Sequence, residues 1–169
     1  MLGPVEDFRI TERREYDMSV SVDISNIILQ QLQDIVDDAT MLEIHTAFAK
    51  RCDPYVPMDE GALSQSAFAQ ITPEYVQWGN EAVPYAHYLY EGNVYGPNIP
   101  IFENGVIVGW FSIPNMPKSP TGRSMNYSTE KHPRATAHWD EVMMQEQGDE
   151  FTKDVENILL RRAREIYGR

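Results

Sequence analysis

Two short turn-bearing motifs at the centre of the chain limit how it can fold. Residues 55–64 read YVPMDEGALS, and residues 83–92 read VPYAHYLYEG. Each motif combines a proline, which fixes one backbone angle, with a glycine suited to a tight turn. Neither carries the residue pattern of an active site. We interpret both as scaffold segments that position a helix, a hairpin and a loop, which favours a structural building block over an enzyme.

The composition predicts one globular domain with an acidic surface. A chain of 169 residues with 42% hydrophobic residues can bury a core. The net charge of -12 disfavours generic binding to DNA phosphates or to a membrane surface. Two interpretations of this acidity stay open. It keeps the protein soluble, or it repels a duplex that passes nearby.

Cysteine content and hydropathy further limit the cellular compartment and the kinds of partner that fit this chain. The single cysteine, Cys52, excludes an intramolecular disulfide and a cysteine-rich zinc site, so an oxidising compartment is not indicated. No apolar run approaches the ~20 residues that cross a bilayer. Residues 1–17 are rich in charge, where a signal peptide needs an apolar core. We therefore expect neither a signal peptide nor a membrane partner.

The N-terminal third predicts an arm followed by a long helix. Residues 1–20 are charged and weakly periodic, and we assign them to an extended arm that is mobile or ordered by a partner. From Asp23, whose carboxylate is suited to capping, apolar residues recur with helical spacing as far as Ala49. Asp53-Pro54 ends this helix, because the residue before proline avoids helical angles. Residues 21–169 are expected to form a single domain.

The middle of the chain predicts a small antiparallel sheet. Residues 64–72 and 75–79 alternate in hydropathy and are joined by a turn at Thr72-Pro73-Glu74, which predicts two strands. The pattern is moderate, since alanine is a weak strand former. Residues 106–113 give the strongest remaining strand signal. These three segments supply the strands of the expected sheet.

Turns and loops separate these strands. Residues 85–90 predict a short helical turn that stops at Glu91-Gly92. Residues 93–104 are rich in proline, glycine and asparagine, and predict an ordered surface loop. Residues 114–127 contain three prolines and predict a second long loop, of the length at which loops are functional or flexible.

The C-terminal third predicts two amphipathic helices. Apolar residues recur with helical spacing over residues 135–145 and again over 151–166, with a break at Gly148-Asp149. Arginines near the end of the second helix offset the helix dipole. The element order therefore predicts an α+β fold, in which a small antiparallel sheet packs against a long N-terminal helix and C-terminal helices, with long loops.

Residue patterns that carry chemistry are weak in this sequence. His132 and His138 suggest a metal site, but a spacing of six residues does not place both rings on one helical face. Cys52 and His45 lie two helical turns apart, which is too far for a hydrogen bond between a nucleophile and its base. No phosphate-binding loop and no nucleophile elbow is present. We expect no catalytic residue, no metal and no cofactor.

Tyrosines gather around the second motif, at positions 85, 88, 90 and 95. Together with Trp78 and Trp110 they are compatible with an interface patch, since aromatic residues are favoured where proteins dock. They are equally compatible with rings that close the core beneath the loops. Both interpretations stay open at this point.

The same segments resemble the minor capsid and tail-completion proteins of long-tailed bacteriophages, which form the head–tail connector or neck. In that family a long first helix leads into a Pro-Val-Asp-Thr-Gly-x-Leu type motif and then a strand. Residues 56–63 (VPMDEGAL) match this motif, with Glu60 at the threonine position. A Tyr-Ala-x-Tyr-x-Glu-x-Gly type segment follows, matched by residues 85–92 with Glu91 one place later. His132-Pro133 matches a later His-Pro near the final helices.

The resemblance covers residues 21–168 and implies a structural virion protein without enzymatic activity. Such proteins form a ring of identical subunits that completes or terminates the tail and joins it to the head. The implied partners are copies of the chain itself, adjacent connector or stopper proteins, and tail-tube proteins. Genomic DNA passes through the channel without sequence-specific binding. The implied location is the virion neck, and the host cytoplasm during assembly.

Ring subunits need two different complementary faces. For these faces we single out the second motif and the C-terminal arginines, namely Tyr88, Tyr90, Glu91, Tyr95, Arg161, Arg162 and Arg164. We hypothesise that the arginines pair with acids such as Asp34, Asp37 and Asp38 of a neighbouring subunit. A second hypothesis is that acidic residues line the channel, so that DNA does not adhere to it.

Three alternatives stay open at the level of sequence. The first is a minor protein attached to the capsid shell. The second is a small metal-dependent hydrolase built around His132 and His138. The third is a host-interaction module that binds through an aromatic surface containing Tyr88 and Tyr95.

Overall fold

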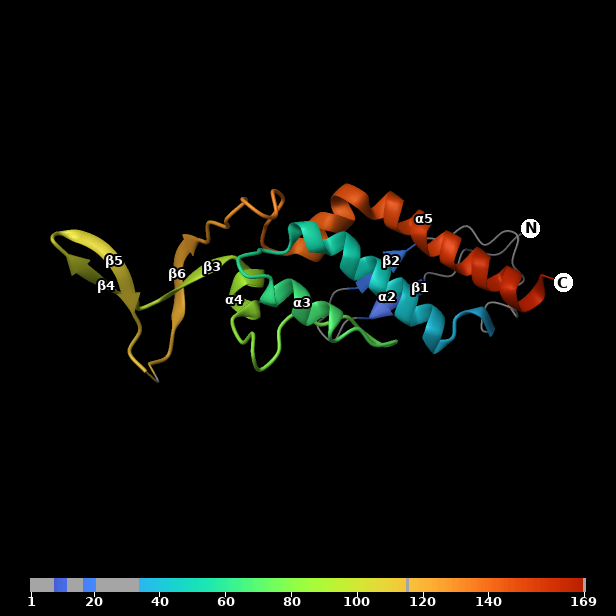
Figure 1. The fold of residues 1–169 in the computed structure, drawn as a ribbon, viewed down its shortest axis with the longest axis horizontal. Coiled ribbons are helices and arrows are strands. Elements are labelled where there is room, and N and C mark those ends of the chain that lie inside the picture. The colour runs from blue at the N-terminus through green and yellow to red at the C-terminus, as the bar shows by residue number, and fades with distance from the viewer. Residues whose placement is uncertain (1–7, 12–16, 21–33, 115, 169) are drawn as a thin grey trace.

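Figure 1 shows an elongated molecule with helices at one end and two β-ribbons at the other. The computed structural model describes residues 8–11, 17–20, 34–114 and 116–168. The helices are α2 (Asp38–Cys52), α3 (Ala62–Phe68), α4 (Ala86–Glu91) and α5 (Trp139–Tyr167), with a 3-10 turn, η1 (Asp53–Tyr55). The strands are β1 (Phe8–Thr11), β2 (Asp17–Val20), β3 (Asn93–Gly96), β4 (Ile99–Glu103), β5 (Val106–Phe111) and β6 (Ser119–Ser124).

The strands of the described residues pair as two-stranded antiparallel ladders, β1 with β2, β3 with β6, and β4 with β5. The predicted α+β class with a small antiparallel set of strands is confirmed. The β3–β6 and β4–β5 ladders lead away from the helices rather than covering them (Figure 1). Part of the predicted arm, residues 8–11 and 17–20, forms the β1–β2 ladder, with Phe8 opposite Val20.

The core lies between α2 and α5, which run antiparallel (Figure 1). Arg51 at the end of α2 donates to Asp154 of α5 at 2.5 Å, whereas Asp37 before α2 pairs with Arg162 further along α5. Close to the first of these ion pairs the rings of Phe48 and Phe151 meet, with centroids 5.4 Å apart. The side chains buried on this contact are Ile44, Phe48, Ala49 and Cys52 of α2, and Met143, Phe151, Val155, Ile158 and Leu159 of α5.

Helix α2 begins much later than the sequence predicts. Asp37 has extended backbone angles and its side chain accepts a hydrogen bond from the Thr40 amide at 2.8 Å, which makes it the N-cap. The Thr40 hydroxyl donates to the Ile35 carbonyl at 2.7 Å and closes the turn before the helix. The prediction of one continuous helix from Asp23 is therefore wrong, because an internal aspartate caps a new helix. The predicted start at Asp23 lies outside the described residues.

The first motif leads into a helix, not into the predicted strand over residues 64–72. Gly61 takes a left-handed conformation with φ of 86°, and α3 begins at the next residue. Alanine, leucine and glutamine supply most of α3, and these residues favour helix over strand. The second predicted strand, residues 75–79, is reduced to a single bridge between Ile71 and Val76.

Tyr55 of the first motif anchors the C-terminal helix. Its ring is buried, and its hydroxyl donates to Glu146 at 2.8 Å and accepts from Gln147 at 2.9 Å. Gln147 is the one non-helical residue inside α5, with φ of -130° and ψ of 17°. The predicted break at Gly148-Asp149 therefore appears as a kink one residue earlier, within a single 29-residue helix.

The predictions around the second motif are partly confirmed. Helix α4 occupies the expected helical turn and ends at Gly92, which has a φ of 69°. Strand β5 confirms the expected strand over 106–113. The two predicted loops are wrong in part, because residues 93–104 contain β3 and β4, and residues 114–127 contain β6.

No helix within the described part of the chain is both long and apolar enough to cross a bilayer.

We predict that Phe151→Ala lowers the free energy of unfolding by about 3–5 kcal/mol, the usual cost of emptying a buried phenylalanine site. Phe102→Ala is the matched control, because Phe102 is 60% exposed on β4 whereas Phe151 is fully buried. Urea denaturation at low protein concentration measures both variants. Equal losses of stability in the two variants would contradict the placement of the core.

His45 is a buried polar exception on α2. Its Nδ1 lies 2.6 Å from the Thr72 carbonyl oxygen, so the proton sits on Nδ1 and is donated. Its Nε2 is buried and has no hydrogen-bond partner within the described part of the chain. Burial lowers the pKa of His45 below its ordinary value of 6.5, and the bond to Thr72 opposes this only in part.

We therefore predict that stability falls as the pH drops below 6.5, because His45 takes up a proton more readily in the unfolded chain than in the folded one. Above this pH the contribution is complete. Urea midpoints about one pH unit above and below 6.5 measure the effect. His45→Gln should reduce the difference between the two midpoints, and His87→Gln, at a side chain that is 45% exposed, should preserve it. Identical differences in all three proteins would refute the assignment.

Candidate functional site

The hairpin formed by β4 and β5 is the most unusual surface of the molecule. Nine large apolar side chains between residues 99 and 113 are each 42–64% exposed: Ile99, Ile101, Phe102, Val106, Ile107, Val108, Trp110, Phe111 and Ile113. The same stretch contains one charged residue, Glu103. Single exposed apolar residues are ordinary, but a contiguous apolar patch on a soluble protein marks an interaction site. We call residues 99–113 the apolar hairpin.

A two-residue turn specifies the hairpin. Asn104 and Gly105 both have positive φ, 51° and 80°, as a type I′ turn requires. Opposite Cα partners run from Ile99 with Phe111 to Glu103 with Val106, and a bulge lies between Ile101 and Phe102. The segments IPIF and VIVGWF that flank the turn are rich in strand-forming residues. The turn and the strand-forming residues of the hairpin are therefore specified by local sequence.

A ribbon of β3 and β6 carries the apolar hairpin away from the helical end (Figure 1). The Thr121 hydroxyl donates to the Val94 carbonyl at 2.7 Å, and the Met125 amide donates to the Gly92 carbonyl at 2.7 Å. At its base, Gly92 packs so closely that an added Cβ would lie 2.7 Å from the Cβ of Ala137. The apolar hairpin therefore stands at the end of a ribbon that is fixed to the helical end.

The free edges of the apolar hairpin add to its capacity for binding. Within the described residues, β4 pairs with β5 alone and β5 with β4 alone. Each strand therefore presents an outer edge of backbone groups to which a further strand can add. Both faces carry exposed apolar side chains, so one flat partner surface cannot cover them all.

The predicted interface residues of the second motif divide between surface and interior. Tyr88 is 39% exposed and its ring stacks edge-on against Tyr95, with centroids 4.7 Å apart. Tyr90 instead turns inward, with its ring 4.9 Å from that of Trp139. The Glu91 carboxylate lies 3.8 Å from His87 on the same helix. Tyr88 and Tyr95 are thus placed where a partner can reach them, whereas Tyr90 packs inside.

The predicted C-terminal arginines bind acids of their own chain. Arg161 donates to Glu43 and Glu165. Arg162 donates to Glu165 at 3.0 Å and to Asp37 at 3.2 Å. The hydrogen bonds from Arg162 and Arg161 lower the pKa of the Glu165 carboxyl. Arg164 is exposed further along α5. Asp37, which we expected to receive an arginine from a neighbouring subunit, therefore receives Arg162 from the same chain.

The histidines named for a metal site hold other contacts. His132 Nδ1 lies 2.8 Å from the Val56 carbonyl oxygen. His138 has a left-handed backbone at the start of α5, and its Nδ1 lies 3.9 Å from Glu141. Among the residues that the structure describes, no three histidine, cysteine, aspartate or glutamate side chains gather closely enough to hold a metal ion. Cys52 and His45 are both buried on α2.

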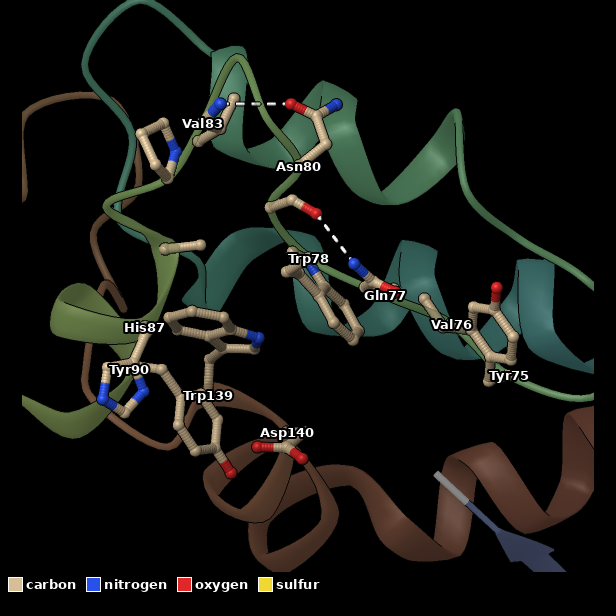
Figure 2. A pocket seen from close by; sticks show the side chains of 13 residues that line it. Tyr75, Val76, Gln77, Trp78, Asn80, Val83, His87, Tyr90, Trp139 and Asp140 are labelled. Atoms are coloured by element: carbon tan, nitrogen blue, oxygen red, sulfur yellow. Dashed lines mark hydrogen bonds between the residues drawn. The ribbon is translucent and has the colours of Figure 1, made fainter. Parts of the chain in front are cut away.

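A cavity of about 500 Å³ opens between the segment from Tyr75 to Ala86 and the start of α5 (Figure 2). Its walls are rich in aromatic side chains: Tyr75, Trp78, His87, Tyr90 and Trp139. Asp140, which is 3% exposed, also lines it. Gly79 brings the wall close to α4, since a Cβ there would lie 2.4 Å from that of Ala86.

Comparison with family models, with curated proteins and with solved structures finds no match to this chain.

Sequence reasoning missed most of the apolar hairpin and the cavity. The signal for the hairpin was present, because Asn104-Gly105 between two apolar runs is a strong short-range hairpin pattern. The cavity had no local signal, since its aromatic residues come from three separate segments. The burial of Asp140 likewise depends on tertiary packing and has no local sequence signal.

Proposed function

We propose that this chain is a subunit of a homo-oligomeric ring at the head–tail neck of a long-tailed bacteriophage. The ring completes or terminates the tail and joins it to the head, and DNA passes through its channel. The apolar hairpin is the observation that carries the proposal, because it is built to be covered by another chain. The sequence motifs supply the phage context.

The apolar hairpin favours a neighbouring subunit as its cover. Strands β4 and β5 lie at the opposite end of the molecule from most of α2 and α5 (Figure 1), and their large apolar side chains are exposed. Two copies of a chain with net charge -12 repel one another, so association requires an element with little charge. The apolar hairpin meets this need, since it carries Glu103 alone.

Its geometry favours a ring over a closed dimer. A projecting hairpin with two apolar faces and two free edges is covered most completely when it lies between neighbours. Such a contact joins the hairpin of one subunit to a different surface of the next, which is a heterologous interface. Heterologous interfaces close into rings when the rotation between subunits permits it. The exposed Tyr88 and the half-buried Tyr95, which are in ring contact near the base of the ribbon, are a candidate part of the receiving surface.

The acidic surface fits passage of DNA through such a ring. A channel wall of negative charge does not attract phosphates, so the duplex can move without adhering. Two alternatives, attachment to the capsid shell through the apolar hairpin and host binding through the surface containing Tyr88 and Tyr95, differ from the neck in their partner. They are therefore separated by identifying the partner.

We predict that the double variant Phe102→Ser with Trp110→Ser abolishes self-association while leaving the urea midpoint of the monomer unchanged. These side chains are 60% and 56% exposed, so their replacement removes interface area and little core. The control is Leu42→Ser with Ile166→Ser, on the helices, at 42% and 44% exposure. Sedimentation velocity over a range of concentrations measures assembly. A wild-type chain that stays monomeric throughout, or a hairpin variant that assembles as the wild type does, would count against the proposal.

The second test is cross-linking mass spectrometry on purified phage particles. Cross-links to portal, connector or tail-tube proteins would support the neck, whereas cross-links to the major capsid protein alone would favour the shell. Absence of the chain from particles would reject a virion role and leave host interaction to be tested.

Lys118 lies at the ribbon, whereas Lys50 and Lys153 lie on the helices. In assemblies mixed from light and heavy isotope forms, we expect Lys118 of one copy to link to Lys50 or Lys153 of another.

A further inference from the structure

The aromatic cavity contains a buried acid. Asp140 is 3% exposed, and its Oδ1 has no hydrogen-bond partner among the residues that the structure describes. Of the described residues that line the cavity, Asp140 is the only carboxylate and none is a lysine or arginine. A buried carboxylate is costly unless a cation or donors satisfy it, so this position invites a positively charged group.

The place of Asp140 in α5 keeps a negative charge favourable there. It is the second residue of α5, where the free backbone N–H groups and the helix dipole favour an anion. This contact accounts for an aspartate at the start of a helix. It does not account for the cavity in front of it, or for the unpaired Oδ1.

The walls of the cavity supply the other half of a cation site. Figure 2 shows the rings of Trp78, Trp139 and Tyr90 grouped on the side of the cavity where Asp140 lies. The centroids of Trp78 and Trp139 are 6.0 Å apart, and those of Tyr90 and Trp139 are 4.9 Å apart. Tryptophan and tyrosine faces attract ammonium and guanidinium groups through their quadrupoles. Aromatic walls with one carboxylate disfavour an anion and select a cation over a neutral group.

We propose that this cavity binds an organic cation, a guanidinium or ammonium group, between the aromatic rings and the Asp140 carboxylate. The volume of about 500 Å³ exceeds what one such group needs, so part of its aliphatic chain also fits. The group comes either from an arginine or lysine side chain of a protein or from a free polyamine. The cation site does not depend on the proposed ring of subunits, because the cavity lies at the helical end of the molecule and the apolar hairpin at the other end.

Tryptophan fluorescence tests the proposal in the full-length chain. Trp78 and Trp139 line the cavity, whereas Trp110 lies on the apolar hairpin. The variant Trp110→Phe therefore restricts the signal to the cavity. Titration at constant ionic strength uses N-acetyl-arginine amide, its neutral isostere N-acetyl-citrulline amide, and the diamine putrescine.

We expect a saturable fluorescence change with the arginine derivative and none with the citrulline derivative. Asp140→Asn in the Trp110→Phe background should weaken binding by about tenfold or more, as expected for loss of a charge-assisted hydrogen bond. Asp149→Asn, at an exposed position of the same helix, should leave binding unchanged. Tighter binding of putrescine than of the arginine derivative would assign the site to free polyamines, and the reverse order to a side chain.

Three results would overturn the proposal: no saturable response to either cation, equal responses to the arginine and citrulline derivatives, or unchanged affinity in Asp140→Asn. Circular dichroism checks that Asp140→Asn folds. If it does not fold, the comparison of arginine with citrulline in the Trp110→Phe chain decides the question by itself.

Discussion

The hydroxyl of Tyr55 is the contact on which the arrangement of the helical end depends. It donates to Glu146, and it accepts from Gln147 and from Arg134 at 2.6 Å. Gln147 also accepts from Arg51 at the end of α2, so one buried phenol connects both long helices. A buried hydroxyl needs such partners, because leaving it unpaired costs more than a hydrogen bond gains. The kink of α5 at Gln147 is the geometry that places its side chain between Tyr55 and Arg51.

This contact also positions the two surfaces with functional potential. The Thr136 amide donates to the Tyr55 carbonyl, and the His138 amide donates to the Tyr90 carbonyl. These two hydrogen bonds fix the segment before α5 against the two motifs. The start of α5 then brings Trp139 and Asp140 to the cavity wall. On the other side of Tyr90, Gly92 begins the ribbon that carries the apolar hairpin. The first motif therefore acts through packing, as the sequence interpretation proposed.

The elements that were predicted correctly are those with a local sequence signal. The predictions were wrong where a single residue, or a contact with a distant segment, determines the structure. Helix α4, strand β5 and the C-terminal helical stripe follow from periodicity and from the stop at Gly92. The prediction of one long first helix is wrong at Asp37, which caps α2. The sequence pattern does not separate the two cases, because an aspartate among apolar residues is compatible with the middle of a helix and with the cap of a new one. Strand β6 reads SPTGRS, which has no strand propensity, and it exists because β3 supplies its partner.

Burial was the property that sequence predicted least well. The run VIVGWF of β5 is typical of a strand covered on both faces, yet its side chains are largely exposed in the single chain. The strand assignment is correct, and in the proposed assembly a neighbouring subunit would supply the missing cover. The contrast between pattern and exposure is therefore itself an argument for a partner.

The contacts of the C-terminal arginines bear on two ways in which the proposed subunits could associate, by ion pairs between neighbours or by burial of the apolar hairpin. Arg161 and Arg162 already bind Glu43, Asp37 and Glu165 within the chain. Pairing with a neighbour would exchange these contacts for similar ones, and exposed ion pairs gain little from such an exchange. A neighbour that covers the apolar hairpin would remove apolar surface from water on both of its faces, which is favourable. No contact within the chain would have to be broken. The apolar hairpin is therefore the stronger basis for the proposed assembly, with the arginines holding α2 and α5 together.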